Sequence, residues 1–166
     1  MSATVEKEND LHEVYASFSG DRLKAAASEA ARAGNDDEAA FWLTALNVWA
    51  QARDKKAEWR KAAEREIGLI KDKLVEALSP VKVYLFGSFA DGRAREDSDL
   101  DFYVVVKDVP QDIIKDLNLA AYRSIRSVRT RAVDIVVETE TNFINGGQSL
   151  IGLESQVKEK GVLLYG

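Results

Sequence analysis

The sequence of 166 residues predicts an α/β domain preceded by an N-terminal helical region. Residues 20–78 are rich in Ala, Glu, Lys, Arg and Leu and contain all three Trp, whereas β-branched runs appear only after Ser79-Pro80. In that second part, strand-like and helix-like patterns alternate, which is typical of a small mixed or mainly parallel sheet covered by helices. We therefore expect a flexible or partly helical N-terminus over residues 1–19, a helical region over 20–79 and an α/β domain over 80–166.

Three helices are predicted in the N-terminal region. Residues 21–33 predict the first, closed by Gly34, and residues 36–53 predict the second, which starts with two acidic residues. The third covers residues 59–78, where apolar side chains recur at steps of three and four. We interpret this apolar stripe as core packing against the sheet and the other helices; a partner-binding face is the alternative.

The elements after Ser79 are predicted from shorter patterns. Strands are expected at residues 82–86, 99–106, 132–137 and 162–165, and helices at residues 110–127 and 148–160. Pro110 fits the first turn of its helix, and Gly161 fits the end of the last one.

Composition excludes several classes of protein. There is no Cys, so disulfides, thiolate zinc sites and a Cys nucleophile are ruled out. The single His, His12, lies in the polar start of the chain, which argues against a His-based metal cage or triad. A net charge of -5 argues against broad binding to nucleic acid.

The first ten residues do not resemble a secretory signal, and no apolar run approaches the length of a membrane span. A cytoplasmic protein without a membrane partner is therefore expected.

Two short motifs indicate chemistry. Gly87-Ser88 follows the first predicted strand, where glycine lets a ligand approach the backbone and serine adds a hydroxyl beside backbone N–H groups. This arrangement is typical of a phosphate-binding turn. Asp99 and Asp101 open the next predicted strand, and because side chains alternate along a strand, both carboxylates share one face.

A third carboxylate extends this pattern. Two like charges on one face raise each other's pKa, and a divalent cation would let both stay ionised. Asp134 lies inside the otherwise apolar strand 132–137, where an unpaired buried carboxylate would be costly. If this strand lies beside the strand of Asp99 and Asp101, the three carboxylates converge on one metal site.

These residues resemble the nucleotidyltransferases of the DNA polymerase beta superfamily, and within it the minimal nucleotidyltransferase type. The family pattern is Gly-Ser, ten residues, Asp-x-Asp and a later acidic residue. The chain matches it in order and spacing at Gly87, Ser88, Asp99, Asp101 and Asp134. The resemblance covers about residues 81–166, including the ending Lys-Gly-Val-Leu-Leu-Tyr at 160–165.

The resemblance implies a nucleotidyltransferase fold for residues 80–166. It also implies transfer of a nucleoside monophosphate from a nucleoside triphosphate, most often ATP, to an acceptor hydroxyl. By this resemblance two Mg²⁺ ions are held by Asp99, Asp101 and Asp134, which are the expected catalytic residues. The nucleotide is expected to contact Gly87, Ser88 and Ser98.

Three kinds of acceptor or partner stay open. Small relatives often act as antitoxins that add AMP to a helical HEPN toxin, and the chain length favours this type. Larger relatives adenylylate aminoglycosides, so a small-molecule acceptor is an alternative. Another alternative is a catalytically weak or inactive protein of this fold that acts by binding and masking its partner. The formation of a homo-oligomer also stays open. The N-terminal helices are expected to help bind the acceptor.

Charged residues near the motif add two expectations. Relatives often carry Arg or Lys where this chain has Asp91, so we expect its carboxylate to point away from the triphosphate or to pair with Arg93 or Arg95. A second group of arginines is interpreted as a solvated helix end, with contact to phosphates or an acidic partner as the alternative. This group consists of Arg123, Arg126, Arg129 and Arg131.

Overall fold

The computed structural model describes residues 19–146 and 152–166. Our prediction for the N-terminus therefore lies, except for residue 19, outside the described residues. Contacts divide the chain into two compact units, Met1–Lys61 and Ala62–Gly166. This division falls inside helix α3 (Asp36–Leu78), whereas the sequence suggested residues 79–80 as the boundary.

The first unit contains helix α2 (Gly20–Arg32) and the first part of α3. The turn between them uses Gly34 at a φ of 75°, a conformation that glycine adopts readily. Asn35 then caps α3: its Oδ1 accepts a hydrogen bond from the backbone N–H of Glu38 at 3.2 Å. The two helices are in close contact, since a Cβ on Gly20 would lie 2.4 Å from the ring of Trp49.

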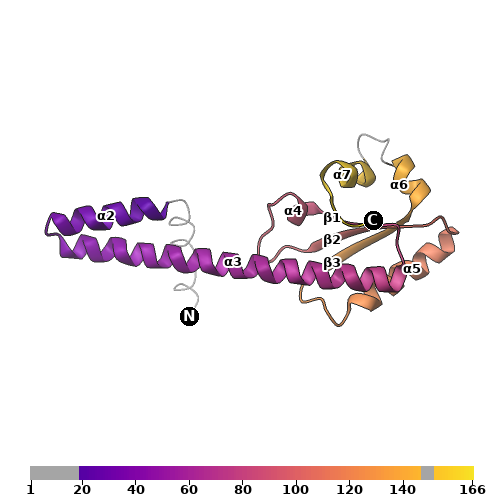
Figure 1. Cartoon of the computed structure of the whole chain (residues 1–166), viewed down its shortest axis with the longest axis horizontal. Coiled ribbons are helices and arrows are strands. Elements are labelled where there is room, and N and C mark those ends of the chain that lie inside the picture. The colour runs from indigo at the N-terminus through magenta and orange to yellow at the C-terminus, as the bar shows by residue number, and fades with distance from the viewer. Residues whose placement is uncertain (1–18, 147–151) are drawn as a thin grey trace, which may run out of the picture. The chain divides into compact units, whose positions relative to one another are not determined.

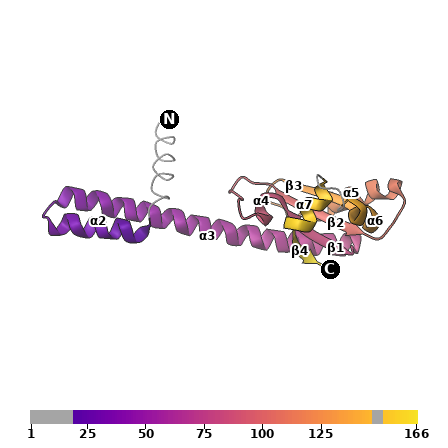
Figure 2. The same ribbon diagram turned by 90° about the horizontal axis from the view of Figure 1, so that it is seen from above.

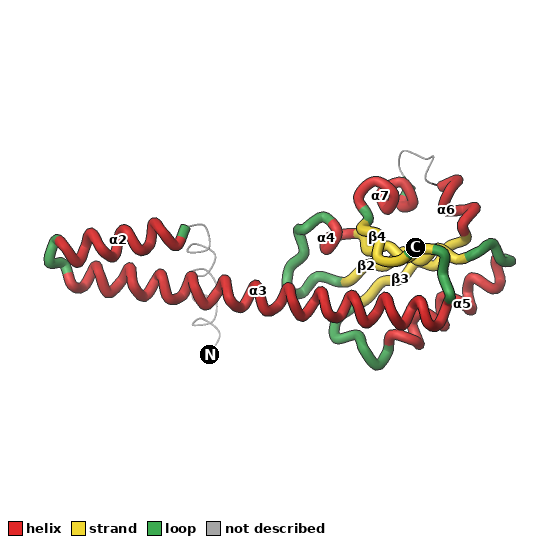
Figure 3. Tube along the Cα trace, in the orientation of Figure 1, coloured by secondary structure: helices red, strands yellow, loops and turns green. Residues whose placement is uncertain are grey.

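Helix α3 is one continuous helix, as Figure 3 shows, and it comprises 43 residues. Our prediction of two separate helices, 36–53 and 59–78, was wrong. The intervening residues 54–58 are mostly charged, which interrupts the apolar pattern, but they include no Gly or Pro. Lys, Ala and Glu favour helix, so nothing in this stretch breaks the backbone hydrogen bonds.

The second unit contains a mixed four-stranded sheet in the order β3-β2-β1-β4, which confirms the predicted fold class (Figure 1). Strand β1 (Lys82–Phe86) pairs antiparallel with β2 (Leu100–Val106) and with β4 (Val162–Tyr165). Strand β3 (Val133–Thr139) runs parallel to β2, and helix α5 (Gln111–Ile125) connects these two strands.

Helices cover both faces of this sheet. The second part of α3 and α5 lie on one face, and α6 (Glu140–Gly146) and α7 (Leu153–Lys160) lie on the other (Figures 1 and 2). The helix predicted for 148–160 is observed from Leu153, and residues 147–151 lie outside the described residues. One more helix, α4 (Gly87–Ala90), is a single turn directly after β1.

The apolar stripe of α3 packs mainly into the larger core. Ile70 and Leu74 are fully buried and Leu78 is 9% exposed, and all three contact the sheet face that carries Leu100 and Phe102. The core-packing interpretation is therefore confirmed for the C-terminal part of the stripe. Among the described helices, none combines the length and the apolar character that crossing a membrane requires.

Candidate active site

Two aspartates lie side by side on neighbouring strands. Asp101 of β2 is opposite Asp134 of the parallel strand β3, and on its other side Asp101 is opposite Phe86 of β1. Because Leu100 and Phe102 face the larger core, alternation places Asp101 on the other sheet face, which α6 and α7 cover. The strand adjacency that the metal-site hypothesis required is thus present.

The ionisation of Asp101 is affected by its burial and by the two neighbouring aspartates. Partial burial raises the pKa of Asp101, and the carboxylates of Asp134 and Asp99 raise that pKa further. Asp99 lies just before β2 and is exposed. Within residues 19–146 and 152–166, no three acidic, His or Cys side chains already form a group able to hold a metal ion.

The environment of Asp134 differs from what the apolar strand suggested. Asp134 is exposed and not buried, because β3 is the last strand in the described sheet and its pattern alternates between buried and open positions. Val133 and Ile135 on either side of it point into the larger core. The argument from a costly buried carboxylate was therefore wrong, although the position next to Asp101 was anticipated.

The Gly-Ser motif forms the turn from β1 into α4. Gly87 has a φ of 69°, which favours glycine, and a Cβ at this position would lie 2.1 Å from Oδ2 of Asp101. The backbone of the turn and the carboxylate of β2 are thus in direct contact. Ser88 follows in α4.

A cavity of about 490 Å³ adjoins this turn. Its lining includes Phe86, Ser88 and Ser98 together with Gln156 and Lys160 of α7. Since Phe86 is the strand partner of Asp101 and Gly87 contacts the Asp101 carboxylate, the cavity adjoins Asp101, although Asp101 and Asp134 are not among its lining residues. The motif residues Gly87, Ser88 and Ser98, which are far apart from α7 in sequence, therefore share one cavity with it.

Asp91 also lines the cavity, and it is paired. Its Oδ2 forms an ion pair with Nη2 of Arg93, one of the two partners expected from the sequence. The carboxylate of Asp91 thus has a cation beside it.

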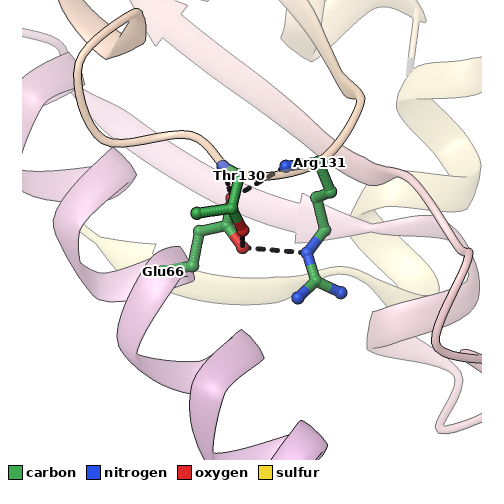
Figure 4. Close-up of polar contacts among 3 residues, drawn as sticks. All are labelled: Glu66, Thr130 and Arg131. Atoms are coloured by element: carbon green, nitrogen blue, oxygen red, sulfur yellow. Dashed lines mark hydrogen bonds and ion pairs between the residues drawn. The ribbon is translucent and has the colours of Figure 1, made fainter.

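A buried carboxylate that sequence reasoning missed holds the loop before β3 (Figure 4). Glu66 of α3 is 5% exposed and accepts hydrogen bonds from the backbone N–H of Thr130 and, at 2.7 Å, from its hydroxyl. Nε of Arg131 donates to the same carboxylate at 2.8 Å. Arg131 is thus not part of a solvated helix end, whereas Arg123, Arg126 and Arg129 are exposed.

The contacts of Arg131 reach α4 as well. Its guanidinium carbon lies 5.6 Å from the ring centroid of Phe89, which follows the Gly-Ser motif. Arg131 lies three positions before Asp134 in the sequence. Glu66 of α3 therefore contacts Arg131. Arg131 in turn lies beside Phe89 of α4 and, in sequence, just before β3, the strand that carries Asp134.

The family model described as "Polymerase beta, Nucleotidyltransferase" matches residues 69–166, more than half of the chain. The chain belongs to this family. The match begins at residue 69, before residue 81, where the resemblance in the sequence begins, and so includes the last turns of α3. The packing of Ile70, Leu74 and Leu78 against the sheet explains this earlier start.

A crystal structure of a candidate nucleotidyltransferase from Sulfolobus solfataricus is similar to the chain at 26% sequence identity, with a TM-score of 0.41. The match covers 61% of this chain and 84% of that one. No curated protein matches the chain.

Proposed function

We propose that this nucleotidyltransferase domain transfers a nucleoside monophosphate, AMP from ATP, to an acceptor hydroxyl with the help of Mg²⁺. The observation that carries the proposal is the position of Asp101, which lies opposite Asp134 and whose pKa is raised by burial and by the charges of Asp134 and Asp99. Family membership supports the reaction class, and the adjoining cavity supports a nucleotide as the substrate.

The three aspartates fit a divalent cation by their chemistry. Carboxylate oxygens are the ligands that Mg²⁺ prefers, and the repulsion around Asp101 is the kind that a cation relieves. We propose that Asp99, Asp101 and Asp134 hold two Mg²⁺ ions, for which their side chains would have to turn toward one another. When bound, such ions stabilise negative charge on the attacking and leaving oxygens of phosphoryl transfer.

The chain's own residues would place the substrates. Gly87 lets the turn lie against Asp101, and the hydroxyls of Ser88 and Ser98, which line the cavity, can donate hydrogen bonds to phosphate oxygens. Asp134 is exposed on the terminal strand of the described sheet, so an acceptor hydroxyl can approach it from outside.

The acceptor is proposed to be a hydroxyl on a partner protein, as in the small relatives that modify a HEPN toxin. Support comes from the first unit, where Phe41 and Leu43 of α3 are 52% and 57% exposed. Because they are two positions apart, these side chains lie on different sides of the helix, and each offers a separate apolar contact to a partner. We assign recognition of the acceptor to this helical region.

Label transfer from ATP tests the proposal. The chain would be incubated with α-labelled ATP, Mg²⁺ and the candidate partner, in wild-type and Asp101→Asn forms. We expect label on the partner and pyrophosphate release with the wild type only. Pyrophosphate release that is equal in the two forms would contradict the proposed site. Partner binding without any label would instead favour a masking protein that does not catalyse transfer.

A further inference from the structure

The loop before β3 is fixed by the buried carboxylate of Glu66 (Figure 4). This carboxylate accepts hydrogen bonds from two successive backbone N–H groups, those of Thr130 and Arg131, the second at 3.3 Å. It also accepts bonds from the Thr130 hydroxyl at 2.7 Å and from Nε of Arg131 at 2.8 Å. Because Glu66 is only 5% exposed, water competes little for these bonds. Helix α3 thus holds the backbone as far as Arg131, three positions before Asp134.

A second contact fixes β3 directly after Asp134. The backbone N–H of Ile135 donates a hydrogen bond to the hydroxyl of Tyr122, in α5, at 3.0 Å. The side chain of Ile135 is buried in the larger core, to which α5 also contributes Ala121 and Ile125. Asp134 therefore lies between a backbone position held by α3 and one held by α5.

These contacts matter because β3 is the last strand of the described sheet. Its neighbour β2 lies on one side, and on the other side no strand of the described residues holds its backbone. Within residues 19–146 and 152–166, no hydrogen bond or ion pair holds the exposed carboxylate of Asp134 itself. The place of this carboxylate is therefore set by the backbone of β3, and so by the side chains that bind that backbone.

We propose that Glu66 and Tyr122 are positioning residues that keep Asp134 opposite Asp101, where the two carboxylates can share a divalent cation. This inference rests on the proposed function, in which these aspartates hold Mg²⁺. Mg²⁺ demands ligands in a near-ideal arrangement, so displacement of a ligand's backbone lowers the affinity although the carboxylate is still present. In metal sites generally, loss of the residues that hold the ligands weakens metal binding by about 10–100-fold.

Titration of the full chain with Mn²⁺ alone, in place of Mg²⁺, tests the inference, because electron paramagnetic resonance measures the free ion directly. Tyr122→Phe removes only one hydroxyl, and Glu66→Gln keeps the size of the side chain. We expect each to weaken Mn²⁺ binding by about tenfold or more. Two controls should leave the affinity unchanged. Tyr165→Phe removes the hydroxyl of a 42% exposed tyrosine from β4, and Glu76→Gln removes an exposed charge from α3.

Combination with Asp134→Asn separates positioning from general support of the fold. If Tyr122 acts through Asp134, Tyr122→Phe should weaken Mn²⁺ binding in the wild-type background and have no further effect in the Asp134→Asn background. Losses of the same size in both backgrounds would show that Tyr122 supports the domain as a whole, and would overturn its positioning role. The same comparison applies to Glu66→Gln. If that variant does not fold, the result for Tyr122 decides.

The outcomes separate this inference from the proposed function. Equal Mn²⁺ affinities for wild type and Tyr122→Phe, or no Mn²⁺ binding by folded wild type, would overturn the positioning role. Label transfer from ATP by the wild type would in that case leave the proposed function intact. Mn²⁺ binding that depends on both Tyr122 and Asp134, in a chain that transfers no nucleotide, would support the positioning role and count against the function.

Discussion

Gly87 and Asp101 are in such close contact that no side chain fits between them: a Cβ on Gly87 would lie 2.1 Å from Oδ2 of Asp101. The glycine has a φ of 69°, so it combines a backbone conformation that disfavours other residues with a position against a carboxylate. The contact joins the turn proposed to bind phosphates to the strand proposed to bind metal. A substitution in the turn is therefore expected to displace the carboxylate of Asp101, and a substitution of Asp101 is expected to alter the turn.

Gly87→Ala is predicted to destabilise the domain and to abolish nucleotide binding. The positive φ alone costs roughly 1–2 kcal/mol for a residue with a Cβ, and the contact with Asp101 adds to this cost. Gly92→Ala is the matched control, because Gly92 has a φ of 72° and nothing within 4 Å of the added Cβ. Urea unfolding should show a larger loss for Gly87→Ala; equal losses would mean that the contact with Asp101 has no energetic importance.

Glu66→Ala is predicted to be strongly destabilising, by about 3–5 kcal/mol, because it leaves the largely buried Arg131 without its partner. Glu76→Ala on the same helix is the control. Its ion pair with Lys73 is exposed, so its loss should cost about 0–1 kcal/mol. The free energy of unfolding of the two variants gives the comparison. A small effect at Glu66 would show that the loop before β3 does not need this carboxylate.

The ionisation of Glu66 predicts a dependence of stability on pH. Burial by itself would raise the pKa of Glu66, but hydrogen bonds from Thr130 and Arg131 and the charge of Arg131 outweigh it, so that pKa is lowered. A carboxylate with a lowered folded-state pKa stabilises the fold above its unfolded-state pKa, and this contribution is lost as the pH falls through the folded-state value.

Wild type should therefore exceed Glu66→Gln in stability at neutral pH, and the difference should shrink in the acid range below the ordinary pKa of glutamate. Unfolding by urea at a series of pH values measures this difference. A constant difference across the series would show that the charge of Glu66 contributes nothing.

The division of the chain inside α3 predicts which truncated chains fold. A chain that starts at Ala62 keeps Ile70, Leu74 and Leu78 in the larger core, whereas one that starts at Ser79 loses them. We expect the first to be soluble with a cooperative thermal transition, and the second to aggregate. The longer fragment should also bind Mg²⁺ and ATP but modify a partner protein poorly. Cooperative unfolding of the fragment from Ser79 would contradict the assignment of α3 to this core.

Much of the fold was predictable because its signals are local. Runs of Val and other apolar residues predicted all four strands to within about two residues at each end, and Gly161 correctly ended the last helix. The continuity of α3 was not predicted, since the charged residues 54–58 interrupt the apolar stripe without breaking the helix. The spacing of apolar residues shows which face of a helix is buried. A stretch of helix that is exposed on all sides has no apolar face, so its spacing does not show that the helix continues.

For the candidate site, the motif residues could be located but their surroundings could not. The spacing of Asp99 and Asp101 is visible in the sequence, and the parallel pairing that brings Asp134 to Asp101 follows once β2 and β3 are neighbours. Glu66 carries no signal, because it is one of many charged residues on α3, and its partner Arg131 lies 65 positions away. The contribution of α7 to the cavity likewise depends on tertiary packing alone.

The central claim is that the aspartates beside the Gly-Ser turn bind a divalent cation together with a nucleoside triphosphate. Calorimetric titration of ATP into wild type and into the double variant Asp99→Ala/Asp101→Ala, with and without Mg²⁺, tests it most directly. The account predicts that wild type binds ATP much more tightly with Mg²⁺ than without it, and that the double variant shows no such difference. Equal Mg²⁺ dependence in the two proteins would contradict it.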